Sequence, residues 1–220
     1  MLRSVELAGR TVAVHGVSLS APEDGIARFR GVLSSDERDR AGRFRFQHLQ
    51  DSFVLARGAL RILLGRYLGA DPASIAFEYA AKGKPGLAPP SRLRFNLSHS
   101  GGVALYAFTL DSDVGIDVEA IRPVMEIESI ARRMFGEDVA REVMSLSPGL
   151  REAAFFRHWT RMEACGKASG DGLSEGYTPG GPYAVQDLDL SPEHAAALAY
   201  LDELRPLEVF PLVEAGRLLS

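Results

Sequence analysis

The sequence predicts an α+β fold, because helix and strand signals are mixed along its 220 residues. The clearest helix signal covers residues 49–68, where apolar residues recur at helical spacing and Gly69 supplies a stop signal. The clearest strand signals are short apolar runs such as 103–110, which follows a Gly101-Gly102 turn. The sequence therefore predicts long helices mixed with short strands.

The remaining elements follow from the same rules. Ser34-Ser35-Asp36-Glu37 is a capping box. Residues 194–201 are ambiguous, since alanine favours helix while the short length also allows a strand. Asp111-Ser112-Asp113 is a candidate boundary between halves 1–111 and 112–220. We expect strands over 11–17, 75–79, 93–97, 103–110 and 114–118, and helices over 34–46, 49–68, 126–146 (broken near Gly136) and 150–168, the last ended by Ser169-Gly170-Asp171-Gly172.

Composition narrows the class of protein. A hydrophobic content of 46% can build a core, and a net charge of −4 argues against non-specific nucleic-acid binding. The single cysteine, Cys165, excludes a disulfide within the chain and a cysteine zinc cluster. The N-terminus has no signal-peptide apolar stretch, and no apolar run is long enough to span a bilayer. We therefore expect a cytoplasmic protein that does not bind a membrane.

Positive charge is concentrated between residues 28 and 66. This segment holds nine arginines and four acidic residues. Such a segment can be a solvated helix face, or it can receive phosphate or an acidic protein partner. Charge alone does not separate these interpretations.

Two carboxylates lie on one side of a predicted strand in Gly115-Ile116-Asp117-Val118-Glu119. Alternate strand residues face the same side, so Asp117 and Glu119 point together while Val118 points into the core. Adjacent acids repel unless a positive charge lies between them. Either a metal ion or solvent exposure at a strand end satisfies this pair.

A second polar group lies on the helix predicted for residues 150–168. Trp159, Glu163 and Lys167 are spaced by four residues and so form one stripe, which is either a surface ion pair or part of a site. His99, in Phe95-Asn96-Leu97-Ser98-His99-Ser100, is either a satisfied loop histidine or a phosphate donor. Three carboxylates, a histidine and a lysine suit a divalent metal with a phosphorylated ligand.

The combination resembles the 4′-phosphopantetheinyl transferase superfamily, and within it the surfactin-synthetase-activating type. The resemblance rests on Phe-Asn-Leu-Ser-His-Ser, on Gly-Ile-Asp-Val-Glu, and on Trp-Thr-x-x-Glu-Ala-x-x-Lys further along the chain. Gly83-Lys84-Pro85 and the segment 55–61 add support. The resemblance runs from about residue 34 to 173.

This resemblance implies a fold and a reaction. The fold is a pseudo-dimer of two similar α+β halves, each a small, mainly antiparallel sheet packed on a long helix, with the active site in the cleft between them. In the reaction, coenzyme A and an apo carrier protein give a holo carrier protein and adenosine 3′,5′-bisphosphate. The partners are acyl, peptidyl or aryl carrier domains, and a monomer suffices.

The resemblance also assigns residues. Asp117, Glu119 and Glu163 would bind Mg²⁺, with Mn²⁺ as the alternative; Glu163, Lys167 and His99 would be catalytic. Glu163 would accept the serine proton, directly or through a bound water. The coenzyme A contacts would come from Arg40, Arg43, Arg57, Lys84, Ser98, His99 and Lys167.

Some features depart from the family pattern, and two other functions stay open. Met162 stands where a basic residue is common, and Gly166 lies inside the helix. A different Mg²⁺-dependent phosphotransferase would be expected to carry a Walker-type loop, and Gly83-Lys84-Pro85 lacks that context. A silent scaffold that binds coenzyme A or a carrier protein is the remaining alternative. For carrier docking we expect a contact at Met125 or Met134.

Overall fold

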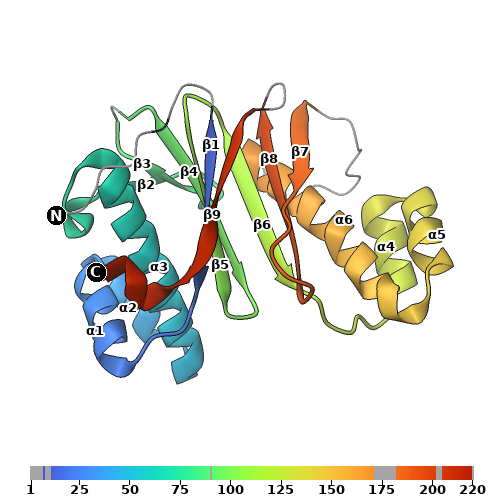
Figure 1. Ribbon diagram of the computed structural model, residues 1–220, viewed down its shortest axis with the longest axis horizontal. Coiled ribbons are helices and arrows are strands. Elements are labelled where there is room, and N and C mark those ends of the chain that lie inside the picture. The colour runs from blue at the N-terminus through green and yellow to red at the C-terminus, as the bar shows by residue number, and fades with distance from the viewer. Residues whose placement is uncertain (1–6, 8–10, 90, 171–181, 202–204, 220) are drawn as a thin grey trace.

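The computed structural model describes residues 7, 11–89, 91–170, 182–201 and 205–219 (Figure 1). It is a mixed α+β structure, as the sequence predicts. The elements are β1 (Val12–Ser18), α1 (Glu23–Gly31), α2 (Ser35–Gly42), α3 (Gln47–Leu68), η1 (Pro72–Ser74), β2 (Phe77–Tyr79), β3 (Pro85–Leu87), β4 (Leu93–Ser100), β5 (Val103–Leu110), β6 (Val114–Ala120), α4 (Ile127–Phe135), α5 (Glu137–Ser145), α6 (Pro148–Ser169), β7 (Tyr183–Asp187), β8 (His194–Leu201), β9 (Leu207–Glu214) and η2 (Ala215–Leu219).

The first sheet has the strand order β4-β5-β1-β9 and packs against α3. Neighbouring strands are antiparallel, except that β9 runs parallel to β1. The long helix α3 is buried along its middle, and Gly69 ends it in the left-handed conformation, as predicted. Its apolar residues form one core with Phe29, Phe95 and Tyr106.

The second sheet has the order β6-β8-β7, is antiparallel, and packs against α6. The pair α4 and α5 packs beside α6, far from α3 (Figure 1). The break between α4 and α5 falls at Gly136, where the backbone has a φ of 91°. The predicted interruption near Gly136 is therefore confirmed.

The inner faces of the two sheets share a core. Val14 of β1 and Leu105 of β5 lie in one buried cluster with Ile116 of β6 and Leu198 of β8. The strands β4 and β6 lie side by side where the sheets meet (Figure 1). This contact places β4 of the first sheet next to the carboxylates of β6.

Residues 194–201 form a strand, which decides the ambiguity left by alanine propensity. Ala197 and Ala199 lie beneath α6 and contact Ala164 and Ala168, whereas Leu198 faces the core shared by the sheets. Small side chains are needed on one face because α6 lies close to it. Packing thus overrides local helix propensity.

Several boundaries differ from the predictions. The helix expected over 34–46 ends at Gly42, and 43–46 redirect the chain into α3. The sequence does not predict helix α1 or strands β7 and β9. Strand β9 contains Pro211, which argues against a strand. The proline is tolerated because β9 lies at the edge of its sheet. Asp171 and Gly172 lie outside the described residues.

The chain returns to the first sheet at its end. Strand β9 pairs with β1, and Arg66 of α3 donates a hydrogen bond to the carbonyl of Leu218. The division into 1–111 and 112–220 stays a prediction. If the two halves are defined by packing, residues 207–219 belong with the first sheet.

Candidate active site

Three polar side chains of β4 connect it to β6. Asn96 accepts a hydrogen bond from the backbone N–H of Ile116 (2.9 Å). The hydroxyl of Ser98 donates to Oδ1 of Asp117, and that of Ser100 donates to Oε2 of Glu119, both at 2.8 Å. Asn96, Ser98 and Ser100 are spaced by two residues, so they share one side of the strand. The polar half of the Asn-Leu-Ser-His-Ser motif therefore holds the carboxylates of β6.

The two carboxylates of β6 share a side, as predicted. Only 3% of the surface of Asp117 is exposed. Glu119 lies closer to solvent and also forms an ion pair with Arg122 (3.0 Å). Val118 between them is buried in the core. The pair therefore presents one buried and one accessible carboxylate.

Helix α6 packs closely against β6 at Gly115. A Cβ atom at Gly115 would lie 2.0 Å from the carbonyl oxygen of Ala164 and 2.4 Å from the backbone nitrogen of Ala168. No side chain fits there, so the backbone of α6 lies directly on β6. Glu163 and Lys167, on the same turns of α6, are brought to Asp117 by this contact.

Lys167 forms hydrogen bonds with both Asp117 and Ser98. Its ammonium donates to Oδ1 of Asp117 (2.6 Å) and to the hydroxyl of Ser98 (2.9 Å). Burial raises the pKa of Asp117, while the charge and hydrogen bond of Lys167 oppose that rise. Oδ2 of Asp117 is buried and has no hydrogen-bond partner. A buried carboxylate oxygen without a partner is costly, which points to a ligand that the structure does not contain.

The surroundings of Glu163 raise its pKa. Burial raises its pKa, the negative charge of Asp117 raises it further, and Lys167 opposes both. A raised pKa brings a carboxylate closer to the value that suits a general base near neutral pH.

These groups line one cavity of about 800 Å³. His99 also lines the cavity. Burial lowers the pKa of His99, the nearby Lys167 lowers it further, and Glu119 opposes them. A volume of this size is within the range of small-molecule sites. Of the predicted site residues, the cavity is lined by Arg40, Arg57, Ser98, His99, Asp117, Glu119, Glu163 and Lys167.

Arg57 reaches the cavity from a buried network. Glu37 pairs with both Arg57 and Arg61, and although burial alone would raise its pKa, the two guanidinium groups hold it below the usual value. Arg57 also donates to the hydroxyl of Tyr79 (2.8 Å) and lies over the ring of Phe77. Glu37 thus fixes an arginine at the cavity wall.

Two predicted basic residues lie elsewhere. Lys84 lines a neighbouring cavity of about 1020 Å³, and Arg43 lines neither cavity. The ammonium of Lys84 is bonded to the carbonyls of Ala168 (3.0 Å) and Val114 (3.3 Å). Their assignment to a phosphate stays a prediction.

The carboxylates of the site are ligands that a hard divalent cation prefers, but they are not arranged as a complete coordination shell. Asp117, Glu119 and Glu163 converge on one cavity, and Oδ2 of Asp117 lacks a partner. Within the residues that the structure describes, no group of three acidic, histidine or cysteine side chains is gathered closely enough to hold a metal ion. Ser100 and Arg122 hold Glu119, and Lys167 holds Asp117. A cation would have to draw these side chains together.

Sequence reasoning missed Asn96, Ser100 and Gly115 as site residues. The signal for the first two was present, since polar residues alternate along a strand that is otherwise apolar. For Gly115 the sequence offers no signal of this kind, because the close approach of α6 exists only in the folded chain.

Two family models match the chain. Residues 113–209 match the model of the 4′-phosphopantetheinyl transferase superfamily, and residues 22–110 match the model of the 4′-phosphopantetheinyl transferase N-terminal region. The matched ranges contain every candidate site residue. The chain belongs to the 4′-phosphopantetheinyl transferase superfamily, which confirms the resemblance found in the sequence.

Curated relatives agree with this assignment. The chain is 41% identical over 162 residues to the 4′-phosphopantetheinyl transferase HetI of Nostoc sp., an alignment that covers 72% of this chain and 68% of HetI. It is 33% identical over 151 residues to the 4′-phosphopantetheinyl transferase psf-1 of Bacillus pumilus, covering 69% and 64% of the two chains. It is 26% identical over 163 residues to Sfp of Bacillus subtilis, covering 73% and 71%. Each alignment spans about two thirds of the relative.

Proposed function

We propose that the protein transfers the 4′-phosphopantetheine arm of coenzyme A to a serine of an apo carrier protein and releases adenosine 3′,5′-bisphosphate. One observation carries the proposal: Asp117, Glu119, Glu163 and Lys167 line a single cavity in a chain that belongs to the superfamily. A pyrophosphate needs cationic groups, and a serine nucleophile needs a base; this cavity offers both.

The proposal includes the architecture. The two halves, built on α3 and α6, would form a pseudo-dimer with the active site in the cleft between them. In support, the cavity is lined by Arg40 and Arg57 from α2 and α3, and by Glu163 and Lys167 from α6. Ligands held there would contact both halves at once.

The carboxylates have separate roles in this proposal. Asp117, Glu119 and Glu163 would hold Mg²⁺, or Mn²⁺ in its place, and the ion would neutralise pyrophosphate charge when bound. Asp117 contributes the buried oxygen that now lacks a partner. Glu119 would have to leave its hydrogen bond with Ser100 and its ion pair with the exposed Arg122 to reach the ion.

The reacting groups are served by α6 and β4. The serine oxygen of the carrier attacks the phosphorus that bears the pantetheine arm, and the bond from that phosphorus to the leaving adenosine 3′,5′-bisphosphate breaks. Glu163, with its raised pKa, receives the serine proton. Lys167 stabilises the charge on the transferring phosphate, and Ser98 holds its ammonium in place. His99, which lines the cavity, would hold phosphate of coenzyme A.

The partner would be an acidic carrier domain, met by the arginines of α1 to α3. Met125 is 89% exposed and remains a candidate carrier contact, whereas Met134 is only 8% exposed and packs in the core with Phe135. Of the two methionines expected at the carrier contact, Met125 is therefore the one we propose, because burial leaves little of Met134 for a partner to touch. No helix in the described part of the chain is long and apolar enough to cross a membrane. A cytoplasmic monomer remains our expectation.

The test uses purified protein, coenzyme A, Mg²⁺ and a panel of apo carrier proteins, read by intact mass. We expect a carrier to gain the mass of phosphopantetheine, and we expect EDTA or Asp117→Asn to abolish the gain. Mn²⁺ should restore activity after EDTA. Coenzyme A binding without transfer to any carrier would favour the silent scaffold instead.

A further inference from the structure

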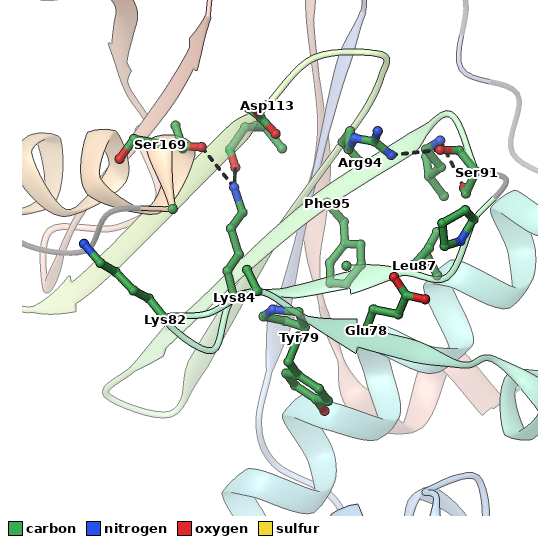
Figure 2. A pocket seen from close by; sticks show the side chains of 18 of the residues that line it. Glu78, Tyr79, Lys82, Lys84, Leu87, Ser91, Arg94, Phe95, Asp113 and Ser169 are labelled. Atoms are coloured by element: carbon green, nitrogen blue, oxygen red, sulfur yellow. Dashed lines mark hydrogen bonds between the residues drawn. The ribbon is translucent and has the colours of Figure 1, made fainter.

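Lys84 links two parts of the molecule that are distant in sequence. It leaves the turn between β2 and β3, and its side chain extends toward the end of α6 and the start of β6 (Figure 2). Its ammonium donates to the carbonyl of Ala168 at 3.0 Å and to that of Val114 at 3.3 Å. A single cation therefore bonds the backbone of α6 and of β6, which carry Lys167 and Asp117.

The two bonded carbonyls lie next to the reactive pair. Ala168 directly follows Lys167, and Val114 lies three residues before Asp117. Lys84 therefore bonds the backbone one residue after Lys167 and three residues before Asp117, whose side chains are 2.6 Å apart. Gly115 brings α6 and β6 into direct contact, and Lys84 holds their ends together.

The charges around Lys84 favour a cation that holds the end of α6 to the start of β6. The carbonyl of Ala168 belongs to the last turn of α6, where backbone carbonyls lack helical partners and the helix dipole favours a cation. Asp113 faces the ammonium as the nearby acidic group, and Arg94 is the opposing cation. Burial disfavours the charged form of Lys84, so bonds to two carbonyls are needed to keep it in place.

We propose that Lys84 is a positioning residue that fixes the Lys167–Asp117 pair by clamping the end of α6 to the start of β6, and that it does not bind the 3′-phosphate of coenzyme A. This inference rests on the proposed function, and it replaces the phosphate role expected from the sequence. The hairpin of β2 and β3 also carries Tyr79, which lines the cavity. The clamp therefore connects one cavity wall to the helix that bears Glu163 and Lys167.

The test compares Lys84→Met, which keeps the length of the side chain and removes its charge, with Lys82→Met. Lys82 is exposed in the same turn and provides the matched control. Each variant is assayed with coenzyme A and with 3′-dephospho-coenzyme A, well below its melting temperature. A clamp predicts that Lys84→Met lowers kcat about tenfold or more for both donors and leaves the ratio of their kcat/KM values within about twofold. A phosphate ligand predicts instead that the preference for coenzyme A disappears, and that outcome overturns the proposal.

Two further readouts separate positioning from simple stability. Lys84→Met should lower the melting temperature by about 3 to 8 °C, because it leaves two carbonyls unpaired. Amide hydrogen exchange in the last turn of α6 should speed up in Lys84→Met and stay unchanged in Lys82→Met. A wild-type kcat in Lys84→Met, or unchanged exchange in that turn, would overturn the clamp. The exchange measurement needs no carrier, so it decides the clamp even if the wild-type protein transfers nothing and the proposed function fails.

Discussion

The ammonium of Lys167 lies 2.6 Å from Oδ1 of Asp117, and each residue comes from a different packed element. Lys167 lies near the end of α6, and Asp117 is in the middle of β6. Ser98 of β4 bonds to both. This three-way contact joins the three sequence motifs in one place, and most of our predictions concern it.

The first prediction concerns the charge of Lys167. Lys167→Met should lower the turnover of transfer by about 10² to 10³, because it removes a cation at the transferring phosphate. Asp117 then loses the charge that opposes its raised pKa, so its pKa should rise further. Single-turnover kinetics measures the first effect. A variant with altered melting temperature and normal turnover would make the pair structural only.

The second prediction concerns Gly115. Gly115→Ala should destabilise the protein by about 3 kcal/mol or more, because its methyl group would meet backbone atoms of α6. Transfer should fall as well, since α6 must move away from Asp117. Gly149→Ala is the matched control: a Cβ there meets no atom within 4 Å, so we expect a change within about 1 kcal/mol. Urea unfolding followed by circular dichroism compares the two, and equal stability would contradict the close-approach argument.

The third prediction separates His99 from the metal ligands. His99→Gln should weaken coenzyme A binding about tenfold, as expected for the loss of one hydrogen bond to a charged phosphate, and leave the Mg²⁺ concentration for half-maximal rate unchanged. Calorimetric titration with coenzyme A gives the affinity. An unchanged affinity would exclude the phosphate role of His99.

The fourth prediction concerns acid stability. His15 of β1 stacks on Phe210 of β9 and bonds to the hydroxyl of Tyr67 (2.6 Å). Burial, aided by the charge of Arg66, lowers its pKa from 6.5 to about 4. The unfolded chain therefore binds more protons between these values, and stability is lost as pH falls from 6.5 toward 4. At pH 5 this loss is about 2 kcal/mol.

The double variant His15→Phe, Tyr67→Phe tests this, because it removes both polar partners and keeps the ring packing. We expect its free energy of unfolding to match the wild type near pH 7.5 and to exceed it at pH 5, as measured by urea titration. A parallel pH profile in both proteins would mean that His15 does not link β9 to acid stability.

Much of the site could be predicted from sequence because its chemistry is local. Asp117 and Glu119 share a side by strand alternation, and Glu163 and Lys167 share a side by helix spacing. Those two rules need no tertiary information. They do not say that the strand and the helix touch, and for that the sequence could only offer a resemblance.

Other features depended on packing. Residues 194–201 become a strand because β8 is the middle strand of its sheet, where β6 and β7 both pair with it. Lys84 lies two residues before Gly86 in a short hairpin, and nothing in that segment indicates that its ammonium meets Ala168, 84 residues away. Arg57 looks like a free cation in the sequence, but Glu37 holds it in a buried pair.

The residue types of the site, their spacing within each element and membership of the superfamily can all be read from the sequence alone. The tertiary structure decided which elements meet: α6 on β6 through Gly115, β4 beside β6 through Asn96 and two serines, and β9 back beside β1. The physical reason is the distance along the chain over which each interaction acts. Backbone periodicity and helix capping act over a few residues, whereas burial, close approach and ion pairing join residues that the chain brings together only when it folds.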